Sequence, residues 1–218
     1  MSLRLASLLV LALAAGSVPA AGPDAEWVPV PAGRFASVLA LGEAGAESEI
    51  EGFSLMRRPV TNAQFLAFVR QHPEWQRGTA PPVFVDSQYL SHWDAALDIG
   101  EAGGNSPVTR VSWFAASAYC EAQGGRLPTW LEWEYVAAAD ETRMDARGDP
   151  AWRERILGWY SRTGGSTLPS VGQTPINAYG VQDLHGLVWE WIDDFNALMI
   201  SADNRDQGDP DLLRFCGA

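Results

Sequence analysis

One glutamate set between two tryptophans constrains this chain more than any other feature. The segment VQDLHGLVWEWIDDF, residues 181–195, places Glu190 between Trp189 and Trp191. The alternation over residues 186–192 predicts a strand in which the tryptophans share one face and Glu190 lies on the other, apolar face. A carboxylate without a compensating partner is costly in apolar surroundings and tends to become protonated. The chain is therefore expected to supply Glu190 with a partner.

Two kinds of partner for Glu190 remain open on the residues alone. One is an arginine, for which Arg126 in GGRLPT is the candidate. The other is a hard cation bound by Glu190, Asp183 and carbonyl oxygens of the turn at Gly186, since calcium prefers such oxygen ligands. Two carboxylates alone make a sparse calcium signature, so a salt bridge or a capping role is the simpler interpretation.

The size, charge and motifs of the chain limit its function. Its 218 residues, 47% of them hydrophobic, are enough for one sizeable core and favour a single domain. The formal net charge of −12 argues against a broad phosphate-binding surface, so nucleic acid is not expected as a partner. The three histidines are scattered, and no GxxxxGK[ST], GxSxG or HExxH motif occurs. The sequence thus offers no phosphate loop, serine-hydrolase nucleophile or zinc site.

The first twenty residues differ from the rest of the chain. They contain Arg4 as their only charged residue, an apolar run from Leu5 to Ala15, and small residues near Ala20. This pattern predicts a secretory signal peptide over residues 1–20 that is removed on export. The alternative is an uncleaved membrane anchor, although the apolar run is short for a bilayer span. The expected product is a periplasmic or secreted protein with no membrane span.

Local patterns predict an α+β fold with little regular structure. Short strands are expected within residues 26–40 and 49–61, where apolar and polar residues alternate between turn residues. Residues 76–107, rich in Gly, Pro, Asp and Ser with scattered aromatics, are expected to be irregular but packed. Helices are expected to follow four N-cap residues, supported by a capping box and by a proline at the first helical position: Thr61, Ser112, Thr129 with Glu132, and Asp149 with Pro150.

The two cysteines leave a second question open. Cys120 and Cys216 could form a disulfide in an oxidising compartment, but their positions in the sequence fix no distance between them. Cys120 stands at helical spacing with Trp113 and Ala116, so a small buried core residue is the simpler interpretation.

Three segments together resemble one known family. PVTNAQFLAFV, PVTRVSWFAASAYCEAQGGRLPTWLEWEYVAAA and NAYGVQDLHGLVWEWIDDF are similar, in order and spacing, to the formylglycine-generating enzyme, or sulfatase-modifying factor, family. The resemblance covers residues 27–218, which are expected to form one sulfatase-modifying-factor-like domain. It implies a variant of the C-type lectin-like fold, which is α+β and poor in regular secondary structure.

The resemblance also implies a calcium site in the segment DLHGLVWE. Matched residue by residue, Asp183 and Glu190 give side-chain oxygens, while Gly186 and Val188 give main-chain carbonyls. Many members carry a YPWG stretch where this chain reads ILGWYSRTGG, and a further site goes with it in some of them. One calcium ion at most is therefore expected.

The chain departs from the family at the residues that carry its chemistry. Formylglycine-generating enzymes oxidise a substrate cysteine with a copper-binding pair of cysteines separated by four residues. The matching strand here is RFCGA, residues 214–218, in which Cys216 falls on a glycine position of the family. No catalytic residue and no copper site are therefore predicted, and whether the chain is an enzyme stays open. The family's final strands do not follow, so the fold is expected to be C-terminally incomplete.

Three functions follow from this comparison. The first is an exported, non-oxidase maturation or accessory factor that binds a periplasmic protein or peptide client; such relatives resemble accessory proteins of copper nitrite reductases. The second is a formylglycine-generating oxidase acting on an exported sulfatase, and the third is a calcium-stabilised structural or binding module. The fold does not decide among them. A C-x4-C pair encoded downstream of Ala218 would favour the oxidase.

Overall fold

Two small antiparallel sheets organise the N-terminal part of the chain. A computed structural model describes residues 26–38, 46–161 and 168–194. Strand β1 (Trp27–Val30) pairs with β4 (Phe53–Met56), with Trp27 opposite Met56. Strand β2 (Gly33–Phe35) pairs with β3 (Ser48–Ile50), with Gly33 opposite Ile50. The prediction of short strands in both segments is confirmed.

Four helices begin at the predicted caps. They are α1 (Asn62–Gln71), α2 (Trp113–Ala122), α3 (Trp130–Ala137) and α4 (Pro150–Tyr160). The side chains of Thr61, Ser112, Thr129 and Asp149 each accept a backbone N–H of the following first turn. Thr61 and Thr129 complete capping boxes with Gln64 and Glu132. The chain also forms two short 3₁₀ turns between α1 and α2, η1 (Pro73–Trp75) and η2 (Gly100–Ala102).

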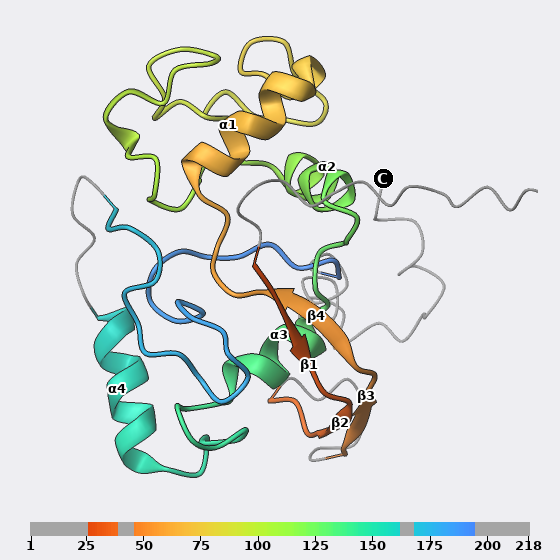
Figure 1. The fold of residues 1–218 in the computed structure, drawn as a ribbon, viewed down its shortest axis with the longest axis vertical. Coiled ribbons are helices and arrows are strands. Elements are labelled where there is room, and N and C mark those ends of the chain that lie inside the picture. The colour runs from red at the N-terminus through yellow and green to blue at the C-terminus, as the bar shows by residue number, and fades with distance from the viewer. Residues whose placement is uncertain (1–25, 39–45, 162–167, 195–218) are drawn as a thin grey trace, which may run out of the picture.

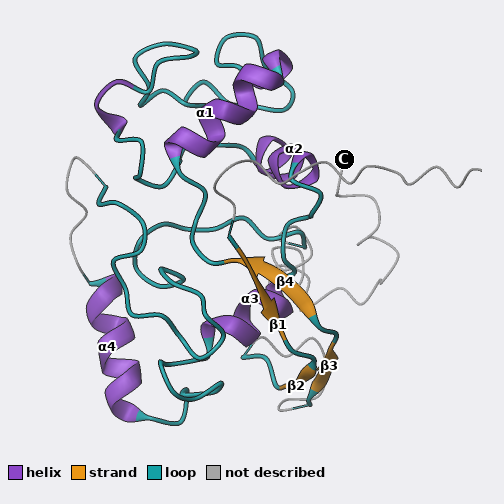
Figure 2. Cartoon of the chain, viewed as in Figure 1, coloured by secondary structure: helices purple, strands orange, loops and turns teal. Residues whose placement is uncertain are grey.

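The elements lie apart along the molecule, with loops between them (Figure 1). Helix α1 and the loops after it form one end, whereas α4 and the β2–β3 pair lie toward the other. Long loops connect the helices and strands (Figure 2), as expected for an α+β fold of low regular content. The 76–107 segment is irregular but packed, since Tyr89, Leu90 and Trp93 within it are buried.

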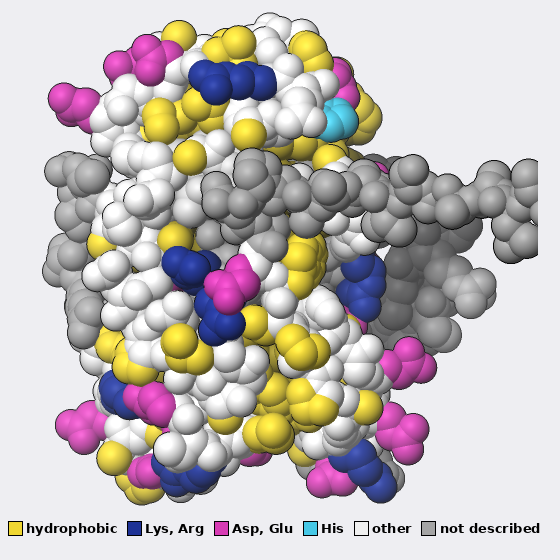
Figure 3. Space-filling view, in the orientation of Figure 1, with side chains coloured by type: hydrophobic (Ala, Val, Ile, Leu, Met, Phe, Trp, Pro, Cys, Tyr) yellow, Lys and Arg dark blue, Asp and Glu magenta, His cyan; other side chains and the backbone are white. Residues whose placement is uncertain are grey.

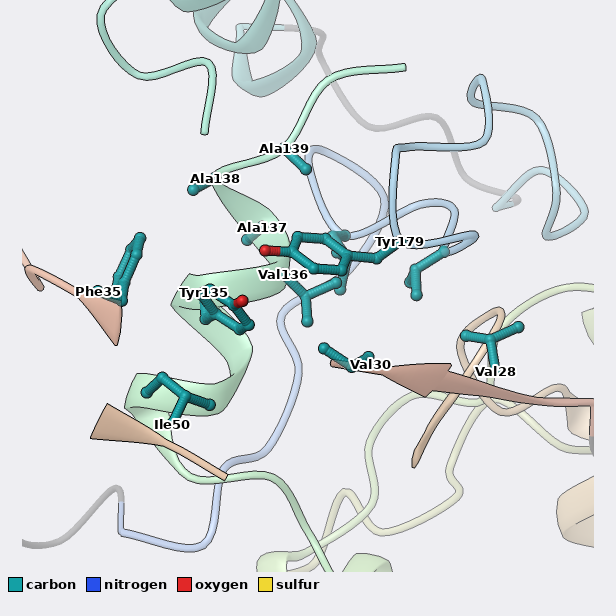
Figure 4. Packing of buried hydrophobic residues seen from close by; sticks show 12 residues of the cluster. Val28, Val30, Phe35, Ile50, Tyr135, Val136, Ala137, Ala138, Ala139 and Tyr179 are labelled. Atoms are coloured by element: carbon teal, nitrogen blue, oxygen red, sulfur yellow. The ribbon is translucent and has the colours of Figure 1, made fainter. Parts of the chain in front are cut away.

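Buried apolar side chains form two separate clusters. The first joins the small sheets to α3 and to residues 179–184, and Tyr135 and Val136 lie at its centre (Figure 4). The second joins α1 and α2 to the 76–107 segment, with Phe65 and Trp93 fully buried. In the first cluster the Phe35 and Tyr135 rings meet edge to face at 5.7 Å.

The prediction of a strand over residues 186–192 is wrong. Within the described residues after α4, 168–194, the chain forms turns and bends but no strand. Gly186, the first residue of the segment, has a positive φ angle of 76°, and residues 187–192 pair with no other described segment, although exposure still alternates over residues 188–192. Side-chain hydrogen bonds shape the loop instead: the Asn177 carboxamide oxygen accepts the backbone N–H groups of Tyr179 and Val181, both at 3.0 Å. Apolar alternation alone did not distinguish such a loop from a strand.

Several predictions concern residues outside the described ranges. The signal peptide over residues 1–20, the 214–218 strand and the position of Cys216 lie there, as does one half of a Cys120–Cys216 disulfide. Among the described helices none has the length and apolar character needed to cross a membrane.

On the face in Figure 3, arginine and acidic side chains lie next to one another, with apolar side chains reaching the surface between them.

Candidate metal-binding turn and adjoining cavity

Asp183 is a buried residue held in a left-handed conformation. Its side chain is only 2% exposed, and its carboxylate accepts hydrogen bonds from the backbone of Gly172 and from the N–H and hydroxyl of Thr174, the last two at 3.0 and 2.9 Å. The Asp183 N–H in turn donates to the Thr174 hydroxyl at 2.6 Å. Asp183 therefore fixes the 183–190 turn against residues 172–174.

Gly186 is required by both its conformation and its neighbours. Its φ of 76° suits glycine, and a Cβ added there would lie 2.7 Å from the Cβ of Trp159 and 3.2 Å from the Trp159 carbonyl oxygen. The turn therefore approaches the backbone of α4 more closely than any residue with a side chain would permit.

Glu190 points toward the interior, as predicted, although no strand directs it there. The indole N–H of Trp133 donates to its carboxylate at 2.6 Å. Burial raises the pKa of Glu190 to about 7, and the negative charge of Asp183 adds to this rise, while the Trp133 hydrogen bond opposes it. Trp189, by contrast, is 91% exposed.

Arg126 is not the partner of Glu190, so the arginine alternative is wrong. Its guanidinium binds both carboxylate oxygens of Glu132 at 2.7 and 2.6 Å. Glu132 also accepts the backbone N–H of Thr129 at 2.8 Å as part of the α3 capping box. The sequence predicts the capping box of Thr129 and Glu132. It does not reveal that Glu132 also binds Arg126, six residues upstream.

His185 is part of this site that sequence reasoning missed. Its Nε2–H donates to the Ala137 carbonyl at 2.8 Å, which leaves Nδ1 to accept the Tyr160 hydroxyl at 3.2 Å. Rings of Trp133, Trp152 and Tyr160 surround it at 5.8 to 6.0 Å between centroids. Burial lowers the pKa of His185, so the imidazole is neutral at neutral pH. Its position beside the Gly186 turn was the only signal in the sequence.

The donor set of the turn fits a single hard cation only in part. Within the described residues, no group of three or more His, Cys, Asp or Glu side chains gathers around one point. Asp183 and Glu190 do act on each other electrostatically, and burial disfavours the charge on Glu190. A cation near both carboxylates would relieve that unfavourable charge, with carbonyl groups such as those of Gly186 and Val188 completing its shell.

An apolar cavity of about 290 Å³ adjoins the turn. Its walls come from both hydrophobic clusters, and Val188, Trp189 and Glu190 lie along it together with Val60 and Tyr119. A second, more polar cleft of about 630 Å³ shares Met56, Arg58, Pro59 and Tyr119 with it. The two hollows therefore meet between the β1–β4 pair and helices α1 and α2.

Cys120 lines the apolar cavity as a thiol. It packs against the second cluster and is half-buried. Burial, with the charge of Glu121 adding to it, raises the pKa of Cys120 to about 11. The expectation of a small buried core residue is confirmed in part, since Cys120 packs against the core cluster but is only half-buried. The thiol keeps its proton at neutral pH.

Comparison with known families gives the decisive match. The model of the sulfatase-modifying factor enzyme 1-like domain matches residues 15–205. The chain belongs to this family. A solved structure titled "Crystal Structure of CarF" shares the fold, with a TM-score of 0.50 over 78% of this chain and 80% of the other at 23% identity.

Curated relatives carry different names within the family. A formylglycine-generating enzyme of Streptomyces coelicolor is 33% identical, over 84% of this chain and 74% of its own length. One of Mycobacterium tuberculosis is 30% identical, over 65% of this chain and 63% of its own. A mouse relative named "Inactive C-alpha-formylglycine-generating enzyme 2" is 30% identical, over 77% and 68%. The chain thus spans about two thirds to three quarters of the length of these relatives.

Proposed function

We propose that this family member is an exported, non-oxidase accessory factor that binds an extended apolar segment of a client protein. The observation that carries the proposal is the apolar cavity between the two hydrophobic clusters, with the exposed Trp189 beside it. A cavity of about 290 Å³ with mostly apolar walls can take apolar side chains of a client out of water, which favours binding.

Cysteine chemistry supports a binding function over an oxidase. Residues 1–218 contain two cysteines, Cys120 and Cys216, which are too far apart in the sequence to form a C-x4-C pair. The Cys120 thiol has a raised pKa and packs against apolar neighbours, which makes it a poor nucleophile and a poor metal ligand. The mouse relative is named inactive, which is consistent with family members that do not generate formylglycine.

Calcium is proposed as a structural ion in this function. Asp183 and Glu190 would supply carboxylate oxygens, and Gly186 and Val188 main-chain carbonyls. When bound, the ion would neutralise the buried acids. The residues themselves fix the turn: Asp183 binds Thr174, Gly186 packs on Trp159, and Trp133 orients Glu190. The 183–190 turn also forms one wall of the apolar cavity.

Photocrosslinking beside the cavity tests client binding. A photoreactive phenylalanine analogue replaces Trp189 in the full chain, which is produced in an exporting host. We expect one exported protein to be crosslinked repeatedly, and its recovery to fall severalfold when Ala116→Phe fills the cavity from α2. Recovery of a copper nitrite reductase would support that specific version of the proposal.

Two controls accompany this experiment. The analogue at Met144, which is 51% exposed and does not line the cavity, should give no such product. Ala151→Phe on the exposed start of α4 should leave the crosslink from position 189 unchanged. Equal labelling from positions 144 and 189, or no response to Ala116→Phe, would count against client binding in the cavity.

A further inference from the structure

A buried asparagine joins α1 to the end of the 76–107 segment. Asn62 is 1% exposed, and its amide nitrogen lies 3.1 to 3.2 Å from the carbonyl oxygens of Ala102, Gly103 and Ser106. Its backbone N–H also donates to the Ser106 carbonyl at 2.9 Å. The first turn of α1 is therefore bound to residues 102–106 by both side chain and backbone.

The oxygen of the same amide holds a second segment. Asn62 Oδ1 accepts the indole N–H of Trp93 at 2.9 Å and lies 3.2 Å from Nε2 of His92. Because this oxygen only accepts, Nε2 of His92 carries the hydrogen in the neutral ring. Nδ1 of His92 is then without a hydrogen, and this buried atom has no hydrogen-bond partner among the described residues. Protonation would place an N–H there with no acceptor to receive it.

The surroundings of His92 disfavour a positive charge. Burial lowers the pKa of His92, and Arg110 and Arg77 lower it further. Both arginines are fixed nearby, since Arg77 donates to the Trp93 carbonyl and Arg110 to the Ser91 hydroxyl, each at 2.5 Å.

The charges that act on His92 come from these two arginines, and no carboxylate of the described residues, including Asp94, Asp98 and Glu101 nearby in the sequence, is among them. The first turn of α1 has no acidic residue, and residues 102–107 carry no charged side chain. The nearest carboxylate along the chain, that of Asp94, lies over Gly100. Among the described residues, a protonated His92 would thus meet two positive neighbours and no negative one.

We propose that His92 is an acid-sensitive latch, which holds α1, residues 90–93 and residues 102–111 together when neutral and loosens them when protonated. Segment 102–111 is bound on both sides, since Val108 N–H donates to Val60 and Leu90 N–H donates to Arg110, each at 2.9 Å. Val108 and Val111 also line the apolar cavity. The latch therefore regulates the wall of the client site; this last step rests on the proposed function, but the latch itself does not.

The direction of the pH effect follows from the lowered pKa. The unfolded chain binds a proton at His92 more readily than the folded chain does, so acid favours opening. The stabilisation is fully present above about pH 6.5, the ordinary histidine value, and is lost as the pH falls from there through the lower folded pKa. Local opening, visible as amide exchange, should increase over the same window.

Hydrogen exchange of the full chain tests the latch. Rates at about pH 7.5 and about pH 5, corrected for the intrinsic pH dependence of exchange, are compared peptide by peptide. In the wild type we expect severalfold weaker protection at the lower pH in residues 60–66 and 88–110. His92→Gln should remove this difference. His72→Gln is the matched control, because His72 is a half-exposed histidine on the same α1 region that stacks on Phe68.

A titration of the wild type covers the case in which His92→Gln fails to fold. Nitrogen and proton shifts of the His92 ring and of the Asn62 side-chain amide should change with one midpoint below about pH 6.5. An unperturbed His92 midpoint, an Asn62 amide that does not follow it, or the same pH response in His92→Gln would overturn the latch. Crosslinking from position 189 separates the two proposals. A client crosslink together with amide protection that does not depend on pH rejects the latch alone. The expected pH-dependent protection without any client crosslink rejects the proposed function alone.

Discussion

At the scale of single residues, the two acids of the 183–190 turn differ in how far their charge is satisfied. Asp183 accepts three hydrogen bonds, two of them from backbone N–H groups, which stabilise a carboxylate. Among the described residues Glu190 has one donor, Trp133, and its pKa is raised to about 7. A bound cation would therefore act mainly on Glu190, which makes that residue the sensitive probe of calcium.

We predict that Glu190→Gln lowers the melting temperature and removes its dependence on calcium. A site that binds only the folded chain adds about 2.7 kcal/mol of stability when calcium is a hundredfold above its Kd. Thermal unfolding with calcium and with a chelator measures both effects. If the chelator leaves the wild-type Tm unchanged, calcium has no structural role here.

The control for this experiment must be chosen from the structure. Glu134 is unsuitable, because it is 6% exposed and accepts the Ser37 hydroxyl and the Val38 N–H, so its loss would destabilise the fold by another route. Glu154 on α4 is exposed, and Glu154→Gln should leave both the Tm and its calcium dependence unchanged.

At the scale of elements, the helix starts show which interactions a sequence reveals. A cap is a contact between residues three apart, so Thr61, Ser112 and Thr129 could be recognised from the order of residues alone. Arg126 lies outside the helix and binds Glu132, the same residue that completes the capping box with Thr129. This additional contact could not be recognised from the cap pattern.

We predict that Thr129→Ala destabilises the protein more than Arg126→Ala does. The threonine closes a capping box, and its loss should cost about 1 kcal/mol. The Arg126 side chain is 58% exposed, and an exposed ion pair contributes about 0.2–1 kcal/mol, an amount that salt reduces. Urea unfolding of both variants at low and high salt measures the difference. A larger loss for Arg126→Ala would show that the arginine acts on more than the cap.

Contacts over long sequence distances could not be predicted in the same way. The turn at Asp183 is closed by Thr174, and Gly186 is fixed by its approach to Trp159, so these conformations depend on tertiary neighbours. A strand likewise needs a pairing partner elsewhere in the chain, and residues 187–192 have none among the described segments, so the alternation over residues 186–192 predicted a strand that does not form. The inward direction of Glu190 was predicted correctly. Exposure alternates along residues 188–192 even though this segment is not paired in a sheet.

At the scale of the whole molecule, fold and family are shown while the reaction is not. The family match and the shared fold place the chain beside formylglycine-generating enzymes. Activity in such a scaffold depends on the site, not on the fold. The described part of the chain contributes a cavity, an acidic turn and one protonated thiol, Cys120. Binding needs only the first of these, whereas oxidation of a substrate cysteine needs reactive sulfur.

We therefore predict that the purified chain does not convert the cysteine of a sulfatase peptide to an aldehyde, even with copper and oxygen supplied. The reason is chemical: a thiol whose pKa is raised to about 11 is a thiolate in only a minute fraction of molecules at neutral pH, and the sequence offers no adjacent second cysteine. Mass spectrometry of the peptide measures the outcome, with an active formylglycine-generating enzyme as the positive control. Aldehyde formation that is lost in Cys216→Ser, but kept in Cys120→Ser, would contradict the accessory function and assign oxidase chemistry to the C-terminal cysteine.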